Sequence, residues 1–231
     1  MVLSNTPVVV RYGMAWAIMA TIALGAVLGT DKLALHASIN MHHSAAADLV
    51  LGWLTHLADG LVPTAIALLI LLFGTRRSFL MIALSCGVSA IIVQGLKQLV
   101  FKDMDRPWKF KEALGDMHWV EGIELHAFNS FPSGHATAAF SMCLALAVIY
   151  DRRWAAIPFA VIAGLLAFTR VYLSQHFTED ILAGSTVGCV VALLIYRWLY
   201  VSRFSQRPWL RRTGLFRQNQ NRAPIAPSRS K

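Results

Sequence analysis

Charged side chains are scarce in this sequence. Asp, Glu, Lys and Arg make up 14% of its 231 residues, whereas an ordinary soluble domain carries about 25%. Hydrophobic residues make up 56%, and the mean hydropathy is +0.54. The composition excludes an ordinary soluble domain and predicts a polytopic membrane protein, for which one domain is enough.

Cysteine is equally scarce, and the three that are present (Cys86, Cys143 and Cys189) each lie in an apolar run. An odd number without extracellular spacing excludes a disulfide framework, and the lack of C-x-x-C spacing excludes the common zinc sites. We therefore expect buried free thiols. No metal site and no cofactor are predicted, because no carboxylate or cysteine pattern accompanies the histidines of the first long loop, His36, His42 and His43.

Acidic residues are absent from the C-terminal part of the chain. Between Arg197 and Lys231 there are nine Lys or Arg residues and no Asp or Glu, while the rest of the chain balances at twelve against twelve. Residues 202–231 are also rich in Gln, Asn, Pro and Ser, so they are predicted to form a disordered cytoplasmic tail. Attraction to anionic lipid head groups explains this charge more simply than nucleic-acid binding does. Residues 1–201 then form the membrane-embedded domain.

Five or six apolar stretches are long enough, or nearly so, to cross a bilayer, whose core of about 30 Å needs roughly 20 helical residues. They predict an all-α, polytopic membrane helix bundle with about six transmembrane helices, near residues 13–31, 61–74, 79–101, 133–150, 154–173 and 181–201. The first stretch is also compatible with a signal peptide, because small residues occur at 23–26. Its long apolar run and single preceding Arg favour a retained helix.

A short amphipathic segment precedes the second stretch. Leu49, Trp53 and Leu57 recur there at helical spacing among polar residues. This pattern predicts a short interfacial helix, or a re-entrant lead-in to the span. Gly60 and Pro63 predict a break before the span begins.

Basic residues mark alternate connections between the stretches. With six spans, one side of the membrane receives all of these basic regions, which are Arg11, Arg76 with Arg77, Arg152 with Arg153, and the C-terminal tail. The positive-inside rule assigns that side to the cytoplasm. Segments 32–60, 102–132 and 174–180 then lie on the other side. We predict a bacterial inner-membrane protein whose active site faces the periplasm.

His176 and Asp180 are four residues apart. If the last helix extends back to this point, the two side chains share one helical face. A carboxylate bonded to one ring nitrogen leaves the other nitrogen free as a nucleophile or base. Arg170 supplies the positive charge that a nucleophile for phosphate needs, although a polar pair that caps a helix remains the simpler alternative.

The sequence Pro132-Ser133-Gly134-His135 stands directly before an apolar helical run. Ser133 suits an N-cap, and Gly134 lets a backbone N–H approach a ligand closely. Exposed N–H groups at a helix start form an anion site. His135 has no structural need at this position, so we expect it to protonate a leaving oxygen.

Lys97 ends the third stretch, and Arg106 follows in the outer loop. A guanidinium group binds two phosphate oxygens at once, and an ammonium adds a point charge. Lys102 is a rival for the role of Lys97. Residues 119–126, in the same outer segment, form either a lid over the site or an unexceptional loop.

In this order the three clusters resemble the motifs of the type 2 phosphatidic acid phosphatase superfamily, which includes bacterial undecaprenyl pyrophosphate phosphatases and other lipid phosphatases. The family pattern is a Lys six residues before Arg-Pro, then Pro-Ser-Gly-His, then Ser-Arg, five residues, His, three residues and Asp. The second motif matches completely. Thr169 replaces the usual Ser in the third, and eight residues rather than six separate Lys97 from Arg106. The resemblance covers roughly residues 50–200.

This resemblance implies a core bundle of six spans and metal-independent phosphoryl transfer. His176 attacks phosphorus to give a phosphohistidine, Asp180 orients it, and His135 protonates the departing alcohol or phosphate. The phosphate oxygens are held by Lys97, Arg106, Ser133, Gly134 and Arg170. Such a preorganised cationic cage stabilises the charge that develops on the equatorial oxygens.

The sequence thus predicts an integral membrane lipid phosphatase that hydrolyses an isoprenoid or glycerolipid phosphate or diphosphate. One alternative is a lipid phosphotransferase that discharges the phosphohistidine onto a lipid acceptor such as lipid A. Another is a non-catalytic lipid-binding protein or transporter. A vanadate-dependent haloperoxidase shares a similar cage, but a soluble halide needs no membrane spans. Neither the substrate lipid nor the oligomeric state follows from the sequence.

Overall fold

A computed structural model describes residues 6–213. In this part of the chain, turns and loops connect a series of helices. The helices are α1 (Thr6–Gly29), α2 (Lys32–Asn40), α3 (Ala45–Leu54), α4 (Leu61–Phe73), α5 (Arg76–Gly95), α6 (Lys111–Leu114), α7 (Gly134–Tyr150), α8 (Ala156–Tyr172) and α9 (Thr178–Tyr196). Two of them continue as π-helical turns, α5 through Leu96–Val100 and α9 through Arg197–Val201. The all-α fold class is confirmed.

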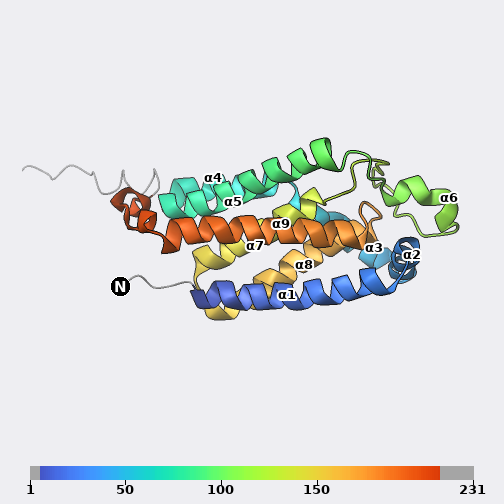
Figure 1. Ribbon diagram of the computed structural model, residues 1–231, viewed down its shortest axis with the longest axis horizontal. Coiled ribbons are helices and arrows are strands. Elements are labelled where there is room, and N and C mark those ends of the chain that lie inside the picture. Colours follow the sequence, from blue (N-terminus) through green and yellow to red (C-terminus); the bar gives the residue numbers. More distant parts are fainter. Residues whose placement is uncertain (1–5, 214–231) are drawn as a thin grey trace, which may run out of the picture.

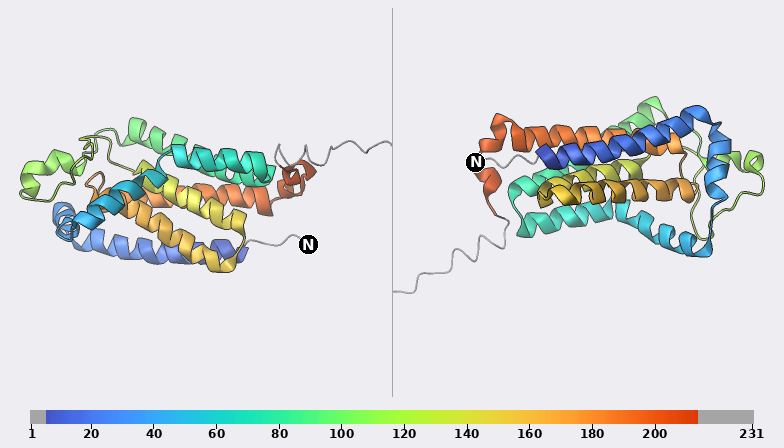
Figure 2. Two further views of the ribbon diagram at one scale, coloured as in Figure 1. Left: turned by 180° about the vertical axis from the view of Figure 1, so that it is seen from behind. Right: turned by 90° about the horizontal axis from the view of Figure 1, so that it is seen from below.

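The longer helices α1, α4, α5, α7, α8 and α9 run side by side along the molecule, and α2, α3 and α6 gather at one end (Figure 1). Helix α7 lies in the middle and packs against α5, α8 and α9. Helix α2 crosses the end of the bundle and leads into α3 (Figure 2). The outer faces are strongly apolar, as Met14, Ile22 and Leu28 of α1 are more than half exposed. An apolar exterior of this kind suits lipid rather than water.

Each of the six predicted stretches is a helix. How many of these helices cross the membrane stays a prediction. By length and composition, four helices can cross a membrane: Thr6–Gly29, Arg76–Leu99, Arg153–Tyr172 and Thr178–Val201. Segments Ala45–Ala58 and Leu61–Phe73 qualify together as a pair bent by 50°. Helix α7 is apolar but has only 17 residues.

Helix α1 belongs to the packed bundle. Tyr12 is completely buried and donates a hydrogen bond to the carbonyl of Phe140 at 3.1 Å. Trp16 donates from Nε1 to Ser185 Oγ at 3.1 Å. These contacts with α7 and α9 support the prediction that the first helix is retained.

The basic connections meet at the end of the bundle away from α2, α3 and α6 (Figure 1). Arg11 contacts the carbonyl of Arg153 at 3.5 Å. The amide of Arg76 donates to the carbonyl of Arg212 at 3.1 Å. The basic connections therefore lie at one end of the bundle, and α2, α3 and α6 lie at the opposite end, as the charge pattern predicts.

The prediction that the tail is disordered from residue 202 is wrong for residues 202–213. This segment forms two 3₁₀ turns, Arg203–Gln206 and Pro208–Arg211. The side chain of Leu210 is completely buried in the core, so the segment gains enough apolar contact to order it. Residues 214–231 lie outside the described part of the chain.

Two glycines bring α7 and α9 into close contact. A Cβ at Gly184 would collide with the carbonyl of Ser133, and one at Gly188 would collide with the carbonyl of Thr137. Small residues at this spacing let two membrane helices approach closely. The approach lets the amide of Ser133 donate to the carbonyl of Asp180 at 3.0 Å. The starts of the two helices are thereby fixed beside each other.

Candidate active site

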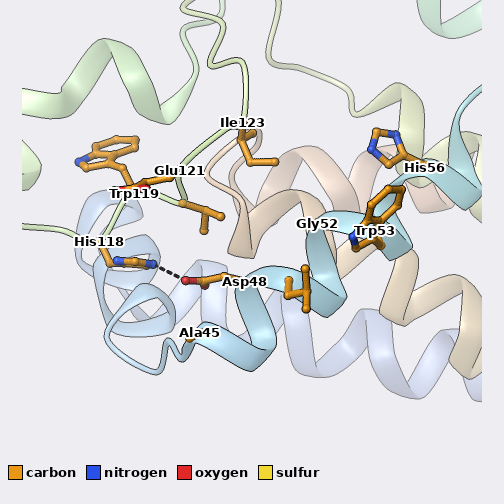
Figure 3. A pocket seen from close by; sticks show the side chains of 11 residues that line it. Ala45, Asp48, Gly52, Trp53, His56, His118, Trp119, Glu121 and Ile123 are labelled. Carbon is orange, nitrogen blue, oxygen red and sulfur yellow. Dashed lines mark hydrogen bonds and ion pairs between the residues drawn. The ribbon is translucent and has the colours of Figure 1, made fainter.

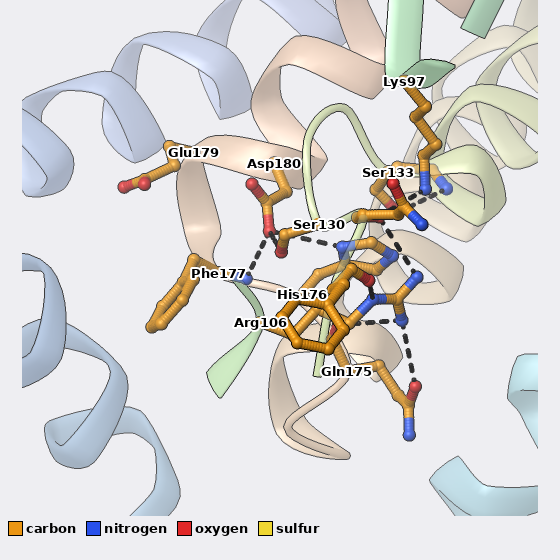
Figure 4. A network of polar contacts seen from close by, with 12 residues as sticks. Lys97, Arg106, Ser130, Ser133, Gln175, His176, Phe177, Glu179 and Asp180 are labelled. Atoms are coloured by element: carbon orange, nitrogen blue, oxygen red, sulfur yellow. Dashed lines mark hydrogen bonds and ion pairs between the residues drawn. The ribbon is translucent and has the colours of Figure 1, made fainter. Parts of the chain in front are cut away.

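Asp180 organises the buried centre of the site (Figure 4). One of its oxygens, Oδ2, accepts from the Phe177 amide at 2.9 Å, from Ser130 Oγ at 2.5 Å, and lies 3.2 Å from His176 Nδ1. Asp180 is completely buried, and His176 is 2% exposed. With Nδ1 of His176 bonded to the carboxylate, Nε2 is the ring nitrogen left to react.

The pair does not share a helical face, contrary to the sequence prediction. Helix α9 begins only at Thr178, and Phe177 before it is extended. Asp180 is the third residue of the helix, so its carboxylate reaches back over the helix start to the Phe177 amide and the His176 ring. The helix start, rather than a helical face, therefore holds the imidazole in place.

The pKa of His176 is lowered to about 3. Burial is the main cause, the cations of Arg106 and Lys97 lower it further, and Asp180 opposes them. The imidazole is therefore neutral at physiological pH, and its free nitrogen keeps the lone pair that an attack on phosphorus requires.

A tight turn links His176 to Arg170 at the end of α8. The amides of Gln175 and His176 both donate to the carbonyl of Arg170, at 2.9 and 3.1 Å. Ser174 adopts a positive φ of 53° within this turn. This turn fixes the distance between the Arg170 guanidinium and the His176 imidazole, which have five residues between them in the third motif.

Arg106 is held by backbone carbonyls and one amide side chain. Its Nε donates to Phe128 O at 2.8 Å, its Nη2 to Asn129 O at 3.3 Å, and its Nη1 to both oxygens of Gln175 at 3.2 Å. Burial lowers the pKa of this guanidinium, and Asp180 opposes the shift. A guanidinium still remains charged in a protein.

Lys97, rather than Lys102, reaches this centre. Lys97 Nζ donates to the Asn129 carbonyl at 2.9 Å, so it shares an acceptor with Arg106. Lys102 is exposed on the loop beyond. Lys97 lies on the π-helical turn Leu96–Val100. Such a turn locally widens the helix, which gives a physical reason for the longer spacing in the first motif.

The Ser-Gly-His motif forms the start of α7. Ser133 Oγ accepts from the Ala136 amide at 3.3 Å, so the predicted N-cap is present. No atom lies within 4 Å of the position a Cβ would take at Gly134, so a ligand can come close to the backbone there. His135 follows, and both Arg170 and Arg106 interact with it electrostatically.

Several residues of the site escaped the sequence analysis. Asp59 Oδ1 lies 2.5 Å from His135 Nε2, and Thr55 Oγ1 accepts from Arg170 Nη1 at 2.8 Å. Ser130 bonds to Asp180, and Gln175 bonds to Arg106. For Asp59 and Thr55 the sequence signals were their place among the polar residues of the amphipathic segment and the break that follows at Gly60.

The Nε atom of Arg170 is buried and has no hydrogen-bond partner within residues 6–213. Buried guanidinium donors are normally paired, and a phosphate oxygen is a suitable acceptor. The predicted site residues lie at one end of the bundle and come from five segments: the π-helical turn after α5, the loop that follows it, the start of α7, the end of α8 and the start of α9.

The loop after α6 contacts the site. The carbonyl of Glu124 accepts from Gln175 Nε2 at 2.7 Å. The carbonyls of Phe128 and Asn129, in the same loop, accept hydrogen bonds from Arg106, and that of Asn129 also accepts from Lys97. Farther out, the loop and α3 enclose a pocket of about 560 Å³ (Figure 3). Trp53, His56, His118 and Trp119 line it, together with Asp48, whose Oδ2 lies 2.9 Å from His118 Nε2.

The histidines of the first long loop have other partners. His36 is buried, with Nε2 3.2 Å from Ser174 Oγ. His43 stacks on His118 with ring centroids 4.0 Å apart. Across residues 6–213, no group of three His, Cys, Asp or Glu side chains is arranged to hold a metal ion. Three cysteines are free thiols, two of them buried.

Comparison with known proteins gives concordant results. The PAP2 superfamily matches residues 78–204. Undecaprenyl-diphosphatase BcrC of Bacillus subtilis (strain 168) is 27% identical over 161 residues, which cover 68% of this chain and 77% of that protein.

Two solved structures share the fold. LpxE of Aquifex aeolicus aligns with a TM-score of 0.62 and 21% identity, over 72% of this chain and 94% of LpxE. A transmembrane PAP2 type phosphatidylglycerolphosphate phosphatase of Bacillus subtilis aligns with a TM-score of 0.61 and 22% identity, over 85% and 98%. With its own apolar helices, this likeness identifies the chain as an integral membrane protein.

Proposed function

This chain belongs to the PAP2 superfamily, and from that membership we propose that it is a membrane lipid phosphatase that hydrolyses a lipid phosphate or diphosphate through a phosphohistidine. The observation that carries the proposal is the setting of His176. Its imidazole is neutral, buried, bonded to Asp180 through Nδ1, and adjacent to the cations of Lys97 and Arg106. This is the arrangement that a nucleophile for phosphorus needs.

In the first step Nε2 of His176 attacks phosphorus, and the bond from phosphorus to the lipid oxygen breaks. His135 gives its proton to the departing oxygen. Asp180 stabilises the positive charge that the phosphorylated ring acquires. Arg106, Arg170 and Lys97 bind the equatorial oxygens, where negative charge accumulates.

In the second step a water molecule attacks phosphorus and the bond between phosphorus and Nε2 breaks. His135, now neutral, takes the proton of the water. Inorganic phosphate leaves, and both histidines regain their starting protonation. The cycle consumes one water and needs no external acid.

The membrane orientation belongs to the same proposal. The basic end of the bundle, with Arg203 and Arg211 exposed at its surface, would meet the anionic head groups of the cytoplasmic leaflet. The site then opens at the periplasmic face of a bacterial inner membrane. A lipid can keep its tail in the bilayer while its phosphate enters the cage.

The relative with the longest sequence match described above is named an undecaprenyl-diphosphatase, and one structural neighbour a phosphatidylglycerolphosphate phosphatase. Both names support a lipid with a terminal phosphoryl group. We therefore propose an isoprenoid or glycerolipid phosphate as the substrate of this chain.

A phosphate-release screen tests the proposal. Purified protein in detergent, with and without a chelator, is given undecaprenyl diphosphate, phosphatidylglycerol phosphate, phosphatidic acid and a lipid A phosphate. Release of phosphate from at least one lipid, lost in His176→Ala, is expected. Full activity in that variant would refute the nucleophile. Transfer of labelled phosphate to a second lipid would identify a phosphotransferase, and lipid binding without turnover a non-catalytic protein.

A further inference from the structure

Asp59 lies at the break between α3 and α4. The chain leaves α3 through the 3₁₀ turn Thr55–Ala58, bends by 50° and enters α4 at Leu61. At this bend both carboxylate oxygens of Asp59 meet imidazoles. Oδ1 lies 2.5 Å from His135 Nε2, and Oδ2 lies 2.8 Å from His56 Nδ1.

Asp59 precedes Gly60, which is the N-cap residue of α4, and the start of this helix has no side-chain cap hydrogen bond. The Asp59 carboxylate instead turns toward the start of α7, which is 76 residues away in the sequence. Helix capping therefore gives no account of this residue, and its contact with His135 does.

Burial opposes protonation of His135, and so do two of the three charged groups that act on it. Arg170 and Arg106 are cations, whereas Asp59 is the carboxylate that faces the ring. A general acid on a phosphate monoester must carry its proton despite this cationic surrounding. Among residues 6–213, Asp59 is the group whose contact with His135 favours the imidazolium form.

We propose that Asp59 is a positioning residue that stabilises the imidazolium form of His135 and directs its Nδ1 proton to the departing lipid oxygen. The proposal rests on the phosphatase function proposed above. Nε2–H of the ring donates to Asp59 Oδ1, so the Nδ1–H bond is the one that breaks as the lipid oxygen gains its proton. In the second step Nδ1 recovers a proton from the attacking water, while the Nε2 bond to Asp59 stays intact.

The same turn also contacts the phosphate-binding side. Thr55 Oγ1 accepts from Nη1 of Arg170 at 2.8 Å, one helical turn before Asp59. A single short segment thus touches both the acid and a cation of the cage.

The dependence of kcat on the leaving group distinguishes a role of Asp59 in proton transfer from a merely structural role. The test compares the lipid phosphate monoester that the wild-type chain cleaves fastest with 4-nitrophenyl phosphate, whose leaving group needs little protonation. General acid catalysis contributes about 10²–10⁴-fold. We expect Asp59→Asn to lower kcat on the lipid about 100-fold and on 4-nitrophenyl phosphate less than about 5-fold.

Asp48 is the matched control. It lies on the preceding helix, pairs with His118 at 2.9 Å and accepts a hydrogen bond from the Tyr172 hydroxyl at 2.5 Å, and neither partner is a proposed catalytic or phosphate-binding residue. Asp48→Asn should change both activities by less than about 3-fold, leaving their ratio unchanged. Thermal unfolding of each variant checks that the fold is intact, and Asp59→Glu, which keeps the carboxylate, should recover part of the lipid activity.

A double-mutant cycle completes the test. If Asp59 acts through His135, adding Asp59→Asn to His135→Ala costs no further activity. Equal loss on both substrates, or a further full loss in the double variant, would overturn the role of Asp59. A wild-type chain that hydrolyses none of the lipids would instead refute the proposed function, so the two failures are distinguishable.

Discussion

Asp180→Asn is the substitution whose outcome the geometry constrains most closely. All three donors to the carboxylate converge on one oxygen, Oδ2, and they come from Phe177, Ser130 and His176. The other oxygen, Oδ1, is buried and has no hydrogen-bond partner within residues 6–213. An asparagine amide therefore has one favourable orientation, with its oxygen at the place of Oδ2.

In that orientation His176 keeps its Nδ1–H tautomer and a free Nε2, and only the negative charge is lost. Hydrogen bonds to charged groups contribute about 1.5–3 kcal/mol and neutral ones about 0.5–1.5 kcal/mol. The difference of about 1–1.5 kcal/mol corresponds to a loss of roughly 10-fold in kcat/KM, since 1.4 kcal/mol is tenfold. In serine proteases, where the same change produces the wrong tautomer, the loss is about 10⁴-fold.

The assay is kcat/KM for phosphate release from the best lipid of the screen, with Asp180→Ala and His176→Ala alongside. Asp180→Ala should be the more damaging change at this position, because it leaves the buried Phe177 amide and Ser130 hydroxyl unpaired. If Asp180→Asn proves as inactive as His176→Ala, the tautomer argument is wrong. The carboxylate would then contribute more than orientation and one charge.

Three further results are expected. Lys97→Ala should raise KM for the lipid or lower kcat at least about 10-fold, through the loss of one charged phosphate contact, whereas Lys102→Ala should leave both within about 2-fold in steady-state kinetics. Gly188→Ala should reduce the unfolding free energy by about 1–3 kcal/mol, because its methyl group collides with the backbone of α7, and thermal unfolding with unchanged helicity would measure this. The pKa values of His36 and His176 are lowered to about 4 and about 3, mainly by burial, so unfolding exposes groups that bind protons more tightly. Stability should be fully present above about pH 6.5 and fall progressively as the pH drops toward 4; a melting temperature that is constant from pH 7 to 4.5 would contradict this.

The motif residues could be predicted from the sequence because each motif is local. Ser133, Gly134 and His135 are consecutive and stand before an apolar helix, which is enough to predict a capped helix start with a reactive side chain. Arg170 and His176 lie on either side of one short turn. Spacing along the chain approximates spacing in space only over such short distances.

The supporting contacts could not be predicted in this way. Asp59 and His135 are 76 residues apart, and Ser130 and Asp180 are 50 apart. Each of these pairs forms only because segments that are distant in the sequence come to lie at the same position along the bundle once the helices have packed. The bare sequence around Asp59 is equally compatible with a solvated helix end.

The sequence by itself determined the class of protein, the positions of the helices and the end of the bundle at which the motif residues lie. Apolar length and basic connections carry that information locally, since a bilayer selects for both. Only the tertiary structure decided that Lys97 and not Lys102 meets Arg106, that α9 begins after His176, and that residues 202–213 fold back onto the core. Those outcomes depend on which carbonyls and apolar surfaces come within a few ångströms once the helices have packed, and short-range packing between distant segments leaves no pattern in a single sequence.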